Sequence, residues 1–278
     1  MILFIEKSGV ILIEKFITDL LQKVETVEQF KMDDHDISLL MAHLGDSDAR
    51  LRDEGLYTLV ALLVEKNCLN TVQLRTMKNQ LLSKNYLFKG MQEDETDDIF
   101  WRSFSNLYLA VIVEYDRTKE HFMSTKELSE IALNLCCYLT LENDNRGFID
   151  GKGWAHAFAH AGDLANELAK HPYLESSDLS LLTVTIFRKV TNFGKMFSFG
   201  EEERLIQSLL TILKKQPDFS VSIICLIEKQ QIEIEKNKSK QELIHQNNYY
   251  NTRRFYQQFL LSSNTPSIVK QKLEKWSI

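Results

Sequence analysis

The residues best suited to acid–base or metal chemistry gather in one segment, residues 146–172 (RGFIDGKGWAHAFAHAGDLANELAKHP). This segment holds four of the chain's ten glycines and three of its seven histidines. If a helix opens near Trp154, successive side chains turn by about 100°, and four polar residues share an arc of about 60°. These residues form one stripe along the helix: His156, His160, Asp163 and Glu167.

Two kinds of chemistry suit this stripe. Imidazoles at positions i and i+4 can bind one metal ion, and a carboxylate one turn later can complete a set of three ligands. His156, His160 and Asp163 are therefore candidate ligands for a divalent metal. The same groups suit general acid–base catalysis, because a nearby carboxylate raises the pKa of a histidine. The pattern is not H-E-x-x-H, since Ala-Phe-Ala separates the histidines, and zincin chemistry is therefore disfavoured.

Two plainer interpretations of the stripe stay open beside the chemical one. Polar residues on one face of an amphipathic helix usually face solvent. They can also form a hydrogen-bonded network that lines a groove. Arg102 and Ser103, within WRSFSNL, also have both a functional and a structural interpretation. They either present a guanidinium and a hydroxyl toward a cleft, or the arginine is buried with an acidic partner.

Helices must position these residues, because apolar side chains recur at helical spacing along almost the whole chain. Only 3 prolines and 10 glycines occur among 278 residues, which favours long helices over a turn-rich β fold. Helix starts are signalled by an S-x-x-E capping box at Ser124 and by the acidic first turn of GEEERL, residues 200–205. The pattern predicts helices near residues 10–25, 36–44, 48–66, 71–84, 97–115, 125–141, 153–170, 176–191, 200–215, 218–244, 247–262 and 266–276.

The predicted helices pair at a period of about 40–50 residues, the range of HEAT and armadillo arrays. Residues 45–66 form one such unit, and residues 96–116 repeat its pattern in an aromatic-rich version. We therefore expect an all-α fold, an α-α superhelix of HEAT or armadillo type built from irregular helical pairs, as a single domain over residues 1–278. The charged segment 228–247 predicts a long exposed helix plus a linker, with a partner-binding helix as the alternative.

Composition narrows the classes of partner. The formal net charge is −6, which disfavours broad electrostatic binding to nucleic acid or to an anionic membrane. The sequence has no run of about 18 uncharged apolar residues, so we expect no transmembrane helix. The four cysteines form no C-x-x-C pair and are typical of buried apolar residues in a reducing compartment, so we expect a cytoplasmic protein.

Five stretches of the chain together resemble a bacterial family known only as domain of unknown function 2785. They are LRDEGLYTLVALL from Leu51, FWRSFSNLYLAVIVEYD from Phe100, the segment from Arg146 given above, FGEEERLIQSLLTIL from Phe199 and RRFYQQFLL from Arg253. The resemblance covers residues from about 50 to 260. It implies an armadillo-like all-helical fold, and no established activity or cofactor. By similarity, nine positions match the family's pattern and are candidate ligand-binding residues on a concave face: Arg102, Ser103, Arg146, Asp150, Lys152, Trp154, His156, His160 and Asp163.

Two functions therefore stay open. The first is a binding or scaffold module, whose polar concave cleft, lined by the RGFIDGKGWAHAFAHAGD motif, takes a peptide or protein segment. The alternative is a metal-dependent hydrolase that uses His156, His160 and Asp163, with Arg102 or Arg146 orienting an anionic group. Because no known catalytic motif is complete in the sequence, we favour the binding module and leave the enzymatic question open.

Overall fold

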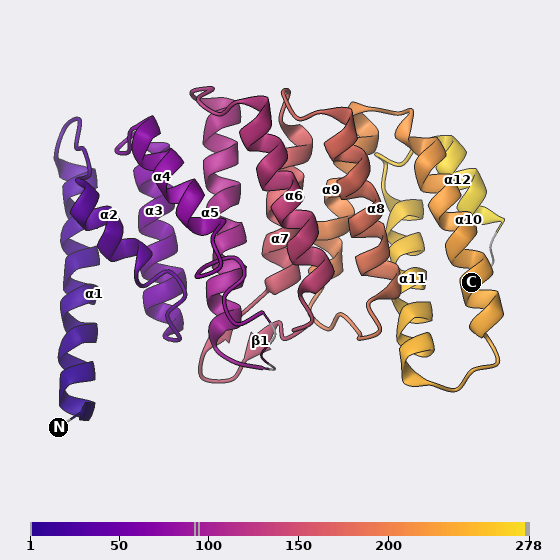
Figure 1. Ribbon diagram of the computed structural model, residues 1–278, viewed down its shortest axis with the longest axis horizontal. Helices are drawn as coiled ribbons and strands as arrows, with labels where there is room; N and C mark the ends of the chain where they lie inside the picture. The colour runs from indigo at the N-terminus through magenta and orange to yellow at the C-terminus, as the bar shows by residue number, and fades with distance from the viewer. Residues whose placement is uncertain (1, 92, 94, 276–278) are drawn as a thin grey trace. The chain divides into compact units, whose positions relative to one another are not determined.

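A computed structural model describes residues 2–91, 93 and 95–275, with side chains described from Leu12 onward (Figure 1). The described residues are mostly helical, so the predicted all-α class is confirmed. The last predicted helix, 266–276, reaches one residue beyond those described. The elements are α1 (Ile2–Thr26), α2 (Asp34–Met41), the π-helical segment η1 (Arg50–Tyr57), α3 (Thr58–Glu65), α4 (Thr71–Leu81), α5 (Asp98–Thr118), α6 (Thr125–Leu141), β1 (Phe148–Ile149), β2 (Gly153–Trp154), α7 (Ala157–Lys170), α8 (Ser176–Asn192), α9 (Glu201–Lys215), α10 (Phe219–Asn237), α11 (Leu243–Leu261) and α12 (Ser267–Glu274).

Backbone contacts divide the chain into two compact units. Unit 1 runs to Phe122 and also takes in Phe148–Ala155, and unit 2 comprises Met123–Gly147 and the chain from His156 onward. The chain therefore passes from unit 1 to unit 2, back to unit 1, and again to unit 2. The expectation of a single domain stays a prediction.

Unit 1 is built on α1, α3 and α5. Helix α3 packs against both α1 and α5, and α4 also packs against α5. Helix α1 buries Ile13, Ile17, Leu20 and Val24, whose spacing of three or four residues places them on one face. Helix α4 begins at a capping box, in which Asn70 and the residue three positions later satisfy each other's backbone N–H groups.

A short β-hairpin of β1 and β2 completes unit 1. Gly151 and Gly153 have φ of 72° and 79°, a left-handed conformation that glycine adopts without steric cost. Arg52, on η1, is fully buried and donates from Nη2 to the carbonyl of Lys152 at 2.9 Å. Its guanidinium also lies 3.9 Å from the centre of the Phe100 ring. The prediction that a helix opens near Trp154 was therefore wrong: that residue ends β2, and α7 begins at Ala157.

In unit 2, helices contact partners two positions along the chain. Helices α6, α8, α10 and α12 pack in that order, and so do α7, α9 and α11. Helix α6 begins at the predicted capping box, in which Ser124 and Glu127 satisfy each other's backbone. The predicted helix 218–244 is shorter in the structure, because α10 ends at Asn237 and α11 begins at Leu243.

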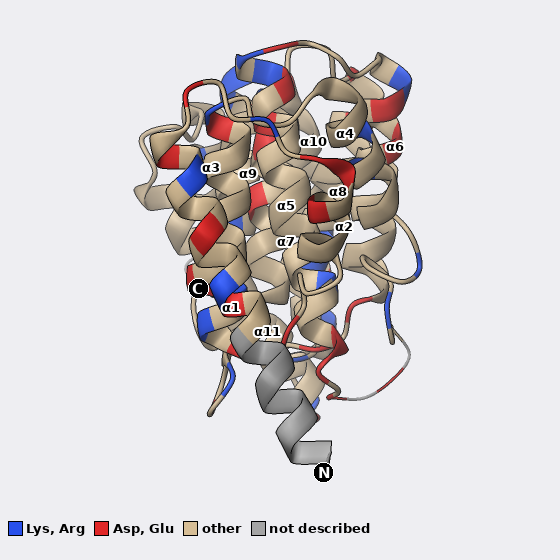
Figure 2. Ribbon diagram, turned by 90° about the vertical axis from the view of Figure 1, so that its left-hand side faces the viewer, with Lys and Arg blue, Asp and Glu red and all other residues tan. Residues whose placement is uncertain are grey.

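Acidic and basic residues occur side by side on the helices, among a larger number of other residues (Figure 2). Among the residues that the structure describes, no helix combines the length and the apolar character that crossing a membrane requires.

Candidate functional site

The start of α7 places two of the predicted histidines together. His156 is the residue before the helix and has φ of 48°, so it is not part of the helical stripe that we predicted. Its imidazole nevertheless lies edge-on to that of His160, with 5.9 Å between ring centres. His160 is buried in the first turn, and its backbone N–H donates to the His156 carbonyl at 3.0 Å.

A buried carboxylate faces His156 from α9. The Nδ1 atom of His156 lies 3.8 Å from Oε1 of Glu201, whose side chain is only 2 % exposed. The other Glu201 oxygen, Oε2, accepts a hydrogen bond from the backbone N–H of Phe199 at 3.0 Å. Burial raises the pKa of Glu201, but the His156 side chain and backbone N–H groups outweigh it, so this pKa lies below its ordinary value.

The third predicted ligand, Asp163, forms an ion pair with α9. Its carboxylate accepts a hydrogen bond from Nη1 of Arg204 at 2.6 Å. Burial raises the pKa of Asp163, and this effect exceeds the opposing effects of Arg204 and His156. Glu167, the last member of the predicted stripe, pairs with Lys170 of its own helix at 2.5 Å.

These groups meet because α7 and α9 approach each other closely. The two helices pack together more extensively than any other pair of described elements. A Cβ on Gly162 would lie 2.6 Å from the backbone carbon of Arg204, so only glycine allows this approach. Gly147 accepts a hydrogen bond from the His156 backbone at 3.3 Å, and a Cβ on it would clash with the side chains of Glu201 and Phe199. The two glycines therefore set the distance between the histidines and α9.

The remaining candidate in unit 2 is Arg146. Its guanidinium is held by Asp144, two residues earlier, with Nη2 at 2.6 Å from Oδ2 and Nε at 2.9 Å from Oδ1. The short loop between α6 and β1 thus fixes the arginine locally.

The other five candidates belong to unit 1. Arg102 is buried and donates to the carbonyl of Lys89 at 2.9 Å, and buried Ser103 donates to the carbonyl of Ala155. Three more lie on the hairpin: exposed Asp150 in its turn, half-buried Lys152, which forms an ion pair with Asp97 at 2.7 Å, and exposed Trp154, which is packed against Phe148.

The residues of α9 that complete the site were not predicted as site residues. Glu201, Glu202 and Arg204 lie in GEEERL, which we interpreted as an ordinary acidic first turn. Glu202 is also buried and pairs with Arg254 of α11 at 3.1 Å, and burial raises its pKa. Buried acidic residues are unusual, so two in one first turn mark a special environment. The sequence could not indicate them, because only the packing of α9 shows which of the three glutamates are buried.

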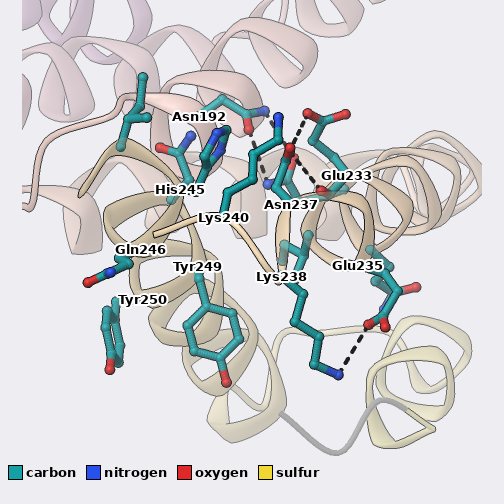
Figure 3. A pocket seen from close by; sticks show the side chains of 15 residues that line it. Asn192, Glu233, Glu235, Asn237, Lys238, Lys240, His245, Gln246, Tyr249 and Tyr250 are labelled. Atoms are coloured by element: carbon teal, nitrogen blue, oxygen red, sulfur yellow. Dashed lines mark hydrogen bonds and ion pairs between the residues drawn. The ribbon is translucent and has the colours of Figure 1, made fainter. Parts of the chain in front are cut away.

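A cavity of about 430 Å³ was also not predicted (Figure 3). It lies where the end of α10 and the start of α11 meet, with Asn192 of α8 at its edge. Most of its lining residues fall within the charged segment 228–247, for which we predicted an exposed helix and a linker. Amide side chains and tyrosines dominate the lining.

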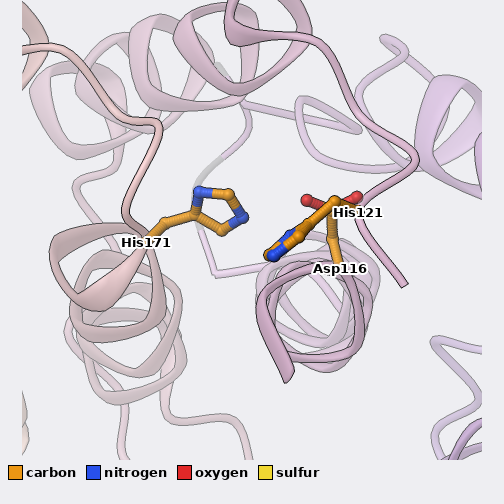
Figure 4. Close-up of side chains that lie close together, drawn as sticks. All are labelled: Asp116, His121 and His171. Carbon is orange, nitrogen blue, oxygen red and sulfur yellow. The ribbon is translucent and has the colours of Figure 1, made fainter. Parts of the chain in front are cut away.

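Unit 1 contains a further pair of titratable residues: Asp116 in the last turn of α5, and His121 in the loop that follows the helix (Figure 4). Asp116 is fully buried and accepts a hydrogen bond from the backbone N–H of Phe122 at 2.7 Å. This bond secures the turn that follows α5.

The fold and the site define a mostly helical protein with a partly buried, ion-paired polar cluster at the start of two adjacent helices. The model of the family described as Protein of unknown function (DUF2785) matches residues 87–261, more than half of the chain, and the chain belongs to this family. The match includes all nine candidate residues and both α7 and α9. No curated protein and no solved structure matched the chain in these comparisons.

Proposed function

We propose that this protein is a binding module, and that the surface around His156, Asp163 and Arg204 contacts an extended peptide or protein segment. The architecture that we propose is an α-α superhelix of HEAT or armadillo type. Support comes from the contacts within unit 2, where each helix packs against the helix two positions along. This alternation is what stacked helical pairs produce, and such arrays offer an extended surface for a partner.

The observation that carries the proposal is the partly exposed ion pair between Asp163 and Arg204. Their side chains are 31 % and 47 % exposed, and 2.6 Å separates the charged atoms. A peptide can add hydrogen bonds to such a pair without breaking it. A metal ion would instead compete with Arg204 for the Asp163 oxygens. The pair therefore favours recognition of a polar chain over coordination of a metal.

Panning a random peptide library on the full chain tests the proposal. We expect peptides that are enriched on the wild type to be lost on the Arg204→Ala variant. The matched control is Lys214→Ala, which removes an exposed cation ten residues further along α9 and should leave capture unchanged. If no peptide is enriched, or if Arg204→Ala retains the same peptides, the proposal is wrong.

A metal-dependent hydrolase that uses His156, His160 and Asp163 is the second candidate. The observation in its favour is the left-handed backbone of His156, beside a second histidine and the buried Glu201 carboxylate. Backbone strain of this kind concentrates at functional sites. Elemental analysis of untagged protein tests this candidate, with the His156→Ala/His160→Ala double variant as the control. Near-stoichiometric zinc, manganese or iron that the variant loses supports the hydrolase, and metal-free wild type contradicts it.

A further inference from the structure

We propose a second binding site in unit 2, separate from the α7–α9 cluster: the cavity between α10 and α11 takes a free α-amino acid with an apolar side chain, held by Glu233 at its ammonium group and by Lys240 at its carboxylate. The site is distinct from the proposed peptide surface and does not depend on it.

The cavity has the dimensions of a small-molecule site. Its volume of about 430 Å³ falls within the range of about 300–1,000 Å³ that is usual for ligand pockets. The last turns of α10, the turn that follows and the first turns of α11 line it (Figure 3). Because these elements and Asn192 at the edge all belong to unit 2, the site lies within one compact unit.

Hydrogen bonds between side chains and loops hold the wall of the cavity in place. Gln230 and Asn192 exchange hydrogen bonds at 3.0 and 3.1 Å, which joins α10 to α8. Asn248 of α11 accepts from the backbone N–H of Gly194 at 2.7 Å. The wall is therefore already ordered, and a ligand that binds there loses little affinity to the ordering of these side chains.

Most of the charged side chains around the cavity already have a partner. Two acidic residues, two lysines and one histidine line it. Lys238 and Glu235 form an ion pair with each other at 3.4 Å. His245 contacts Glu242, which is not a lining residue, at 3.0 Å from Nε2. One acidic residue and one lysine remain.

The remaining two are Glu233 and Lys240, and neither has an ion-pair partner among the described residues. The Oε1 atom of Glu233 accepts a hydrogen bond from Nδ2 of Asn237 at 2.7 Å, which orients the carboxylate and leaves Oε2 for a ligand. The side chain of Lys240 extends toward the same end of the cavity (Figure 3). Two opposite charges that share one end of a cavity and are not paired with each other suit a ligand that carries both signs.

An α-amino acid matches this arrangement of charges. Its ammonium group and its carboxylate are attached to the same carbon atom, so one head group can contact two opposite charges that lie near each other. A simple anion would pair with Lys240 but meet the like charge of Glu233, and a simple cation would meet the reverse. The pair of residues therefore selects a zwitterion over either ion alone.

Apolar surface in the cavity selects the side chain of the ligand. Ile234 of α10 and Ile244 of α11 both line it, and Tyr249 and Tyr250 add aromatic surface (Figure 3). An apolar side chain that leaves water against this surface gains free energy in proportion to the area that it buries. We therefore expect leucine, methionine and phenylalanine to bind more tightly than glycine.

Titration calorimetry of the full chain with L-leucine, L-methionine and L-phenylalanine tests the proposal. The N-acetyl form of an amino acid lacks the positive charge and its amide lacks the negative charge, so each derivative removes one of the two contacts. We expect each derivative to bind at least about tenfold more weakly than the free amino acid, because hydrogen bonds between charged groups are the strong ones. If none of the three amino acids binds, or if the derivatives bind as tightly, the proposal is wrong.

Two variants assign the two contacts. Lys240→Gln should bind the free amino acid as weakly as the wild type binds the amide, and Glu233→Gln should bind it as weakly as the wild type binds the N-acetyl form. Both residues are exposed, so we expect the thermal midpoint to stay unchanged. Lys229→Gln, which removes an exposed cation of α10 outside the cavity, is the matched control and should bind like the wild type. A Lys240→Gln or Glu233→Gln variant that keeps the wild-type affinity overturns the proposal.

Discussion

At the scale of single residues, the cluster at α7 is held by groups whose protonation differs between the folded and unfolded chain. Glu201 is buried beside His156 and accepts from a backbone N–H, and these contacts favour its ionised form. Lys189, elsewhere in unit 2, lies over the rings of Phe158 and Phe193, and burial lowers its pKa to about 8. Glu201 therefore predicts how the stability changes in acid, and Lys189 predicts how it changes in base.

Glu201 contributes stability that acid removes. Because its pKa in the folded chain is below the ordinary value of 4.5, the unfolded chain binds the proton more tightly as the pH falls through and below 4.5. We expect the free energy of unfolding of the wild type to exceed that of Glu201→Gln at neutral pH, and the difference to shrink in acid. Urea unfolding of both proteins at several pH values, from neutral to below 4.5, measures this difference.

The matched control for Glu201 is Glu203→Gln. This residue is exposed in the same first turn of α9, so its substitution removes a carboxylate from the same helix start without touching the contact with His156. If Glu201→Gln behaves like Glu203→Gln, the contact with His156 does not stabilise the folded state.

Lys189 predicts a gain of stability in base. Burial lowers its pKa to about 8, so between about pH 8 and 10.5 the unfolded chain binds more protons than the folded chain. Over that interval the free energy of unfolding of the wild type should rise relative to that of Lys189→Met. Chemical unfolding at several pH values tests this, and a constant difference between the two proteins contradicts it.

At the scale of elements, the site depends on how closely α7 approaches α9. A methyl group on Gly162 would lie 2.6 Å from the Arg204 carbonyl carbon and 2.7 Å from the Leu205 nitrogen. Backbone atoms cannot move aside as a flexible side chain can, so the helices would have to separate. The Asp163–Arg204 ion pair joins the same two helices and would change with them.

Gly162→Ala should therefore lower the free energy of unfolding by about 1–3 kcal/mol, the usual cost of overpacking. Gly55→Ala is the matched control, because its new methyl group would meet the nearest atoms at 3.4 Å and 3.5 Å. Alanine is also the better helix former, so this control should be neutral or slightly stabilising. Equal effects of the two substitutions would show that the close approach is not what makes Gly162 important.

The same scale shows how far the sequence alone can predict this molecule. Helices followed from apolar spacing and from caps such as Ser124, since both signals are local. The hairpin could not be predicted in this way, because the residue that secures it, Arg52, lies 100 residues earlier in the chain. His156, His160 and Asp163 were predicted as neighbours from their spacing, but the partners on α9 depend on tertiary packing and have no local signal.

At the scale of the whole molecule, the chain passes from unit 1 to unit 2, back to unit 1 and again to unit 2. Residues Phe148–Ala155 of unit 1 lie between two segments of unit 2, so neither unit is one continuous stretch. The prediction of a single domain therefore needs a test of whether the two units unfold together.

Calorimetry of two variants tests that prediction. Arg52→Ala removes a buried guanidinium from unit 1, and Gly162→Ala disturbs unit 2. For a single cooperative domain, we expect one thermal transition that both variants move to lower temperature. Two transitions, each moved by only one variant, would contradict the prediction and establish two domains.

The interrupted chain also has a consequence for synthesis. A ribosome delivers the chain from its N-terminal end, so α1 to α5 emerge before the hairpin, which belongs to the same unit. Until Ala155 has left the exit tunnel, Arg52 lacks the two hairpin carbonyls, those of Lys152 and Trp154, to which it donates in the finished protein. By that time all of α6 has emerged as well. The nascent chain therefore passes through an interval in which its first unit is unfinished and its second has already begun.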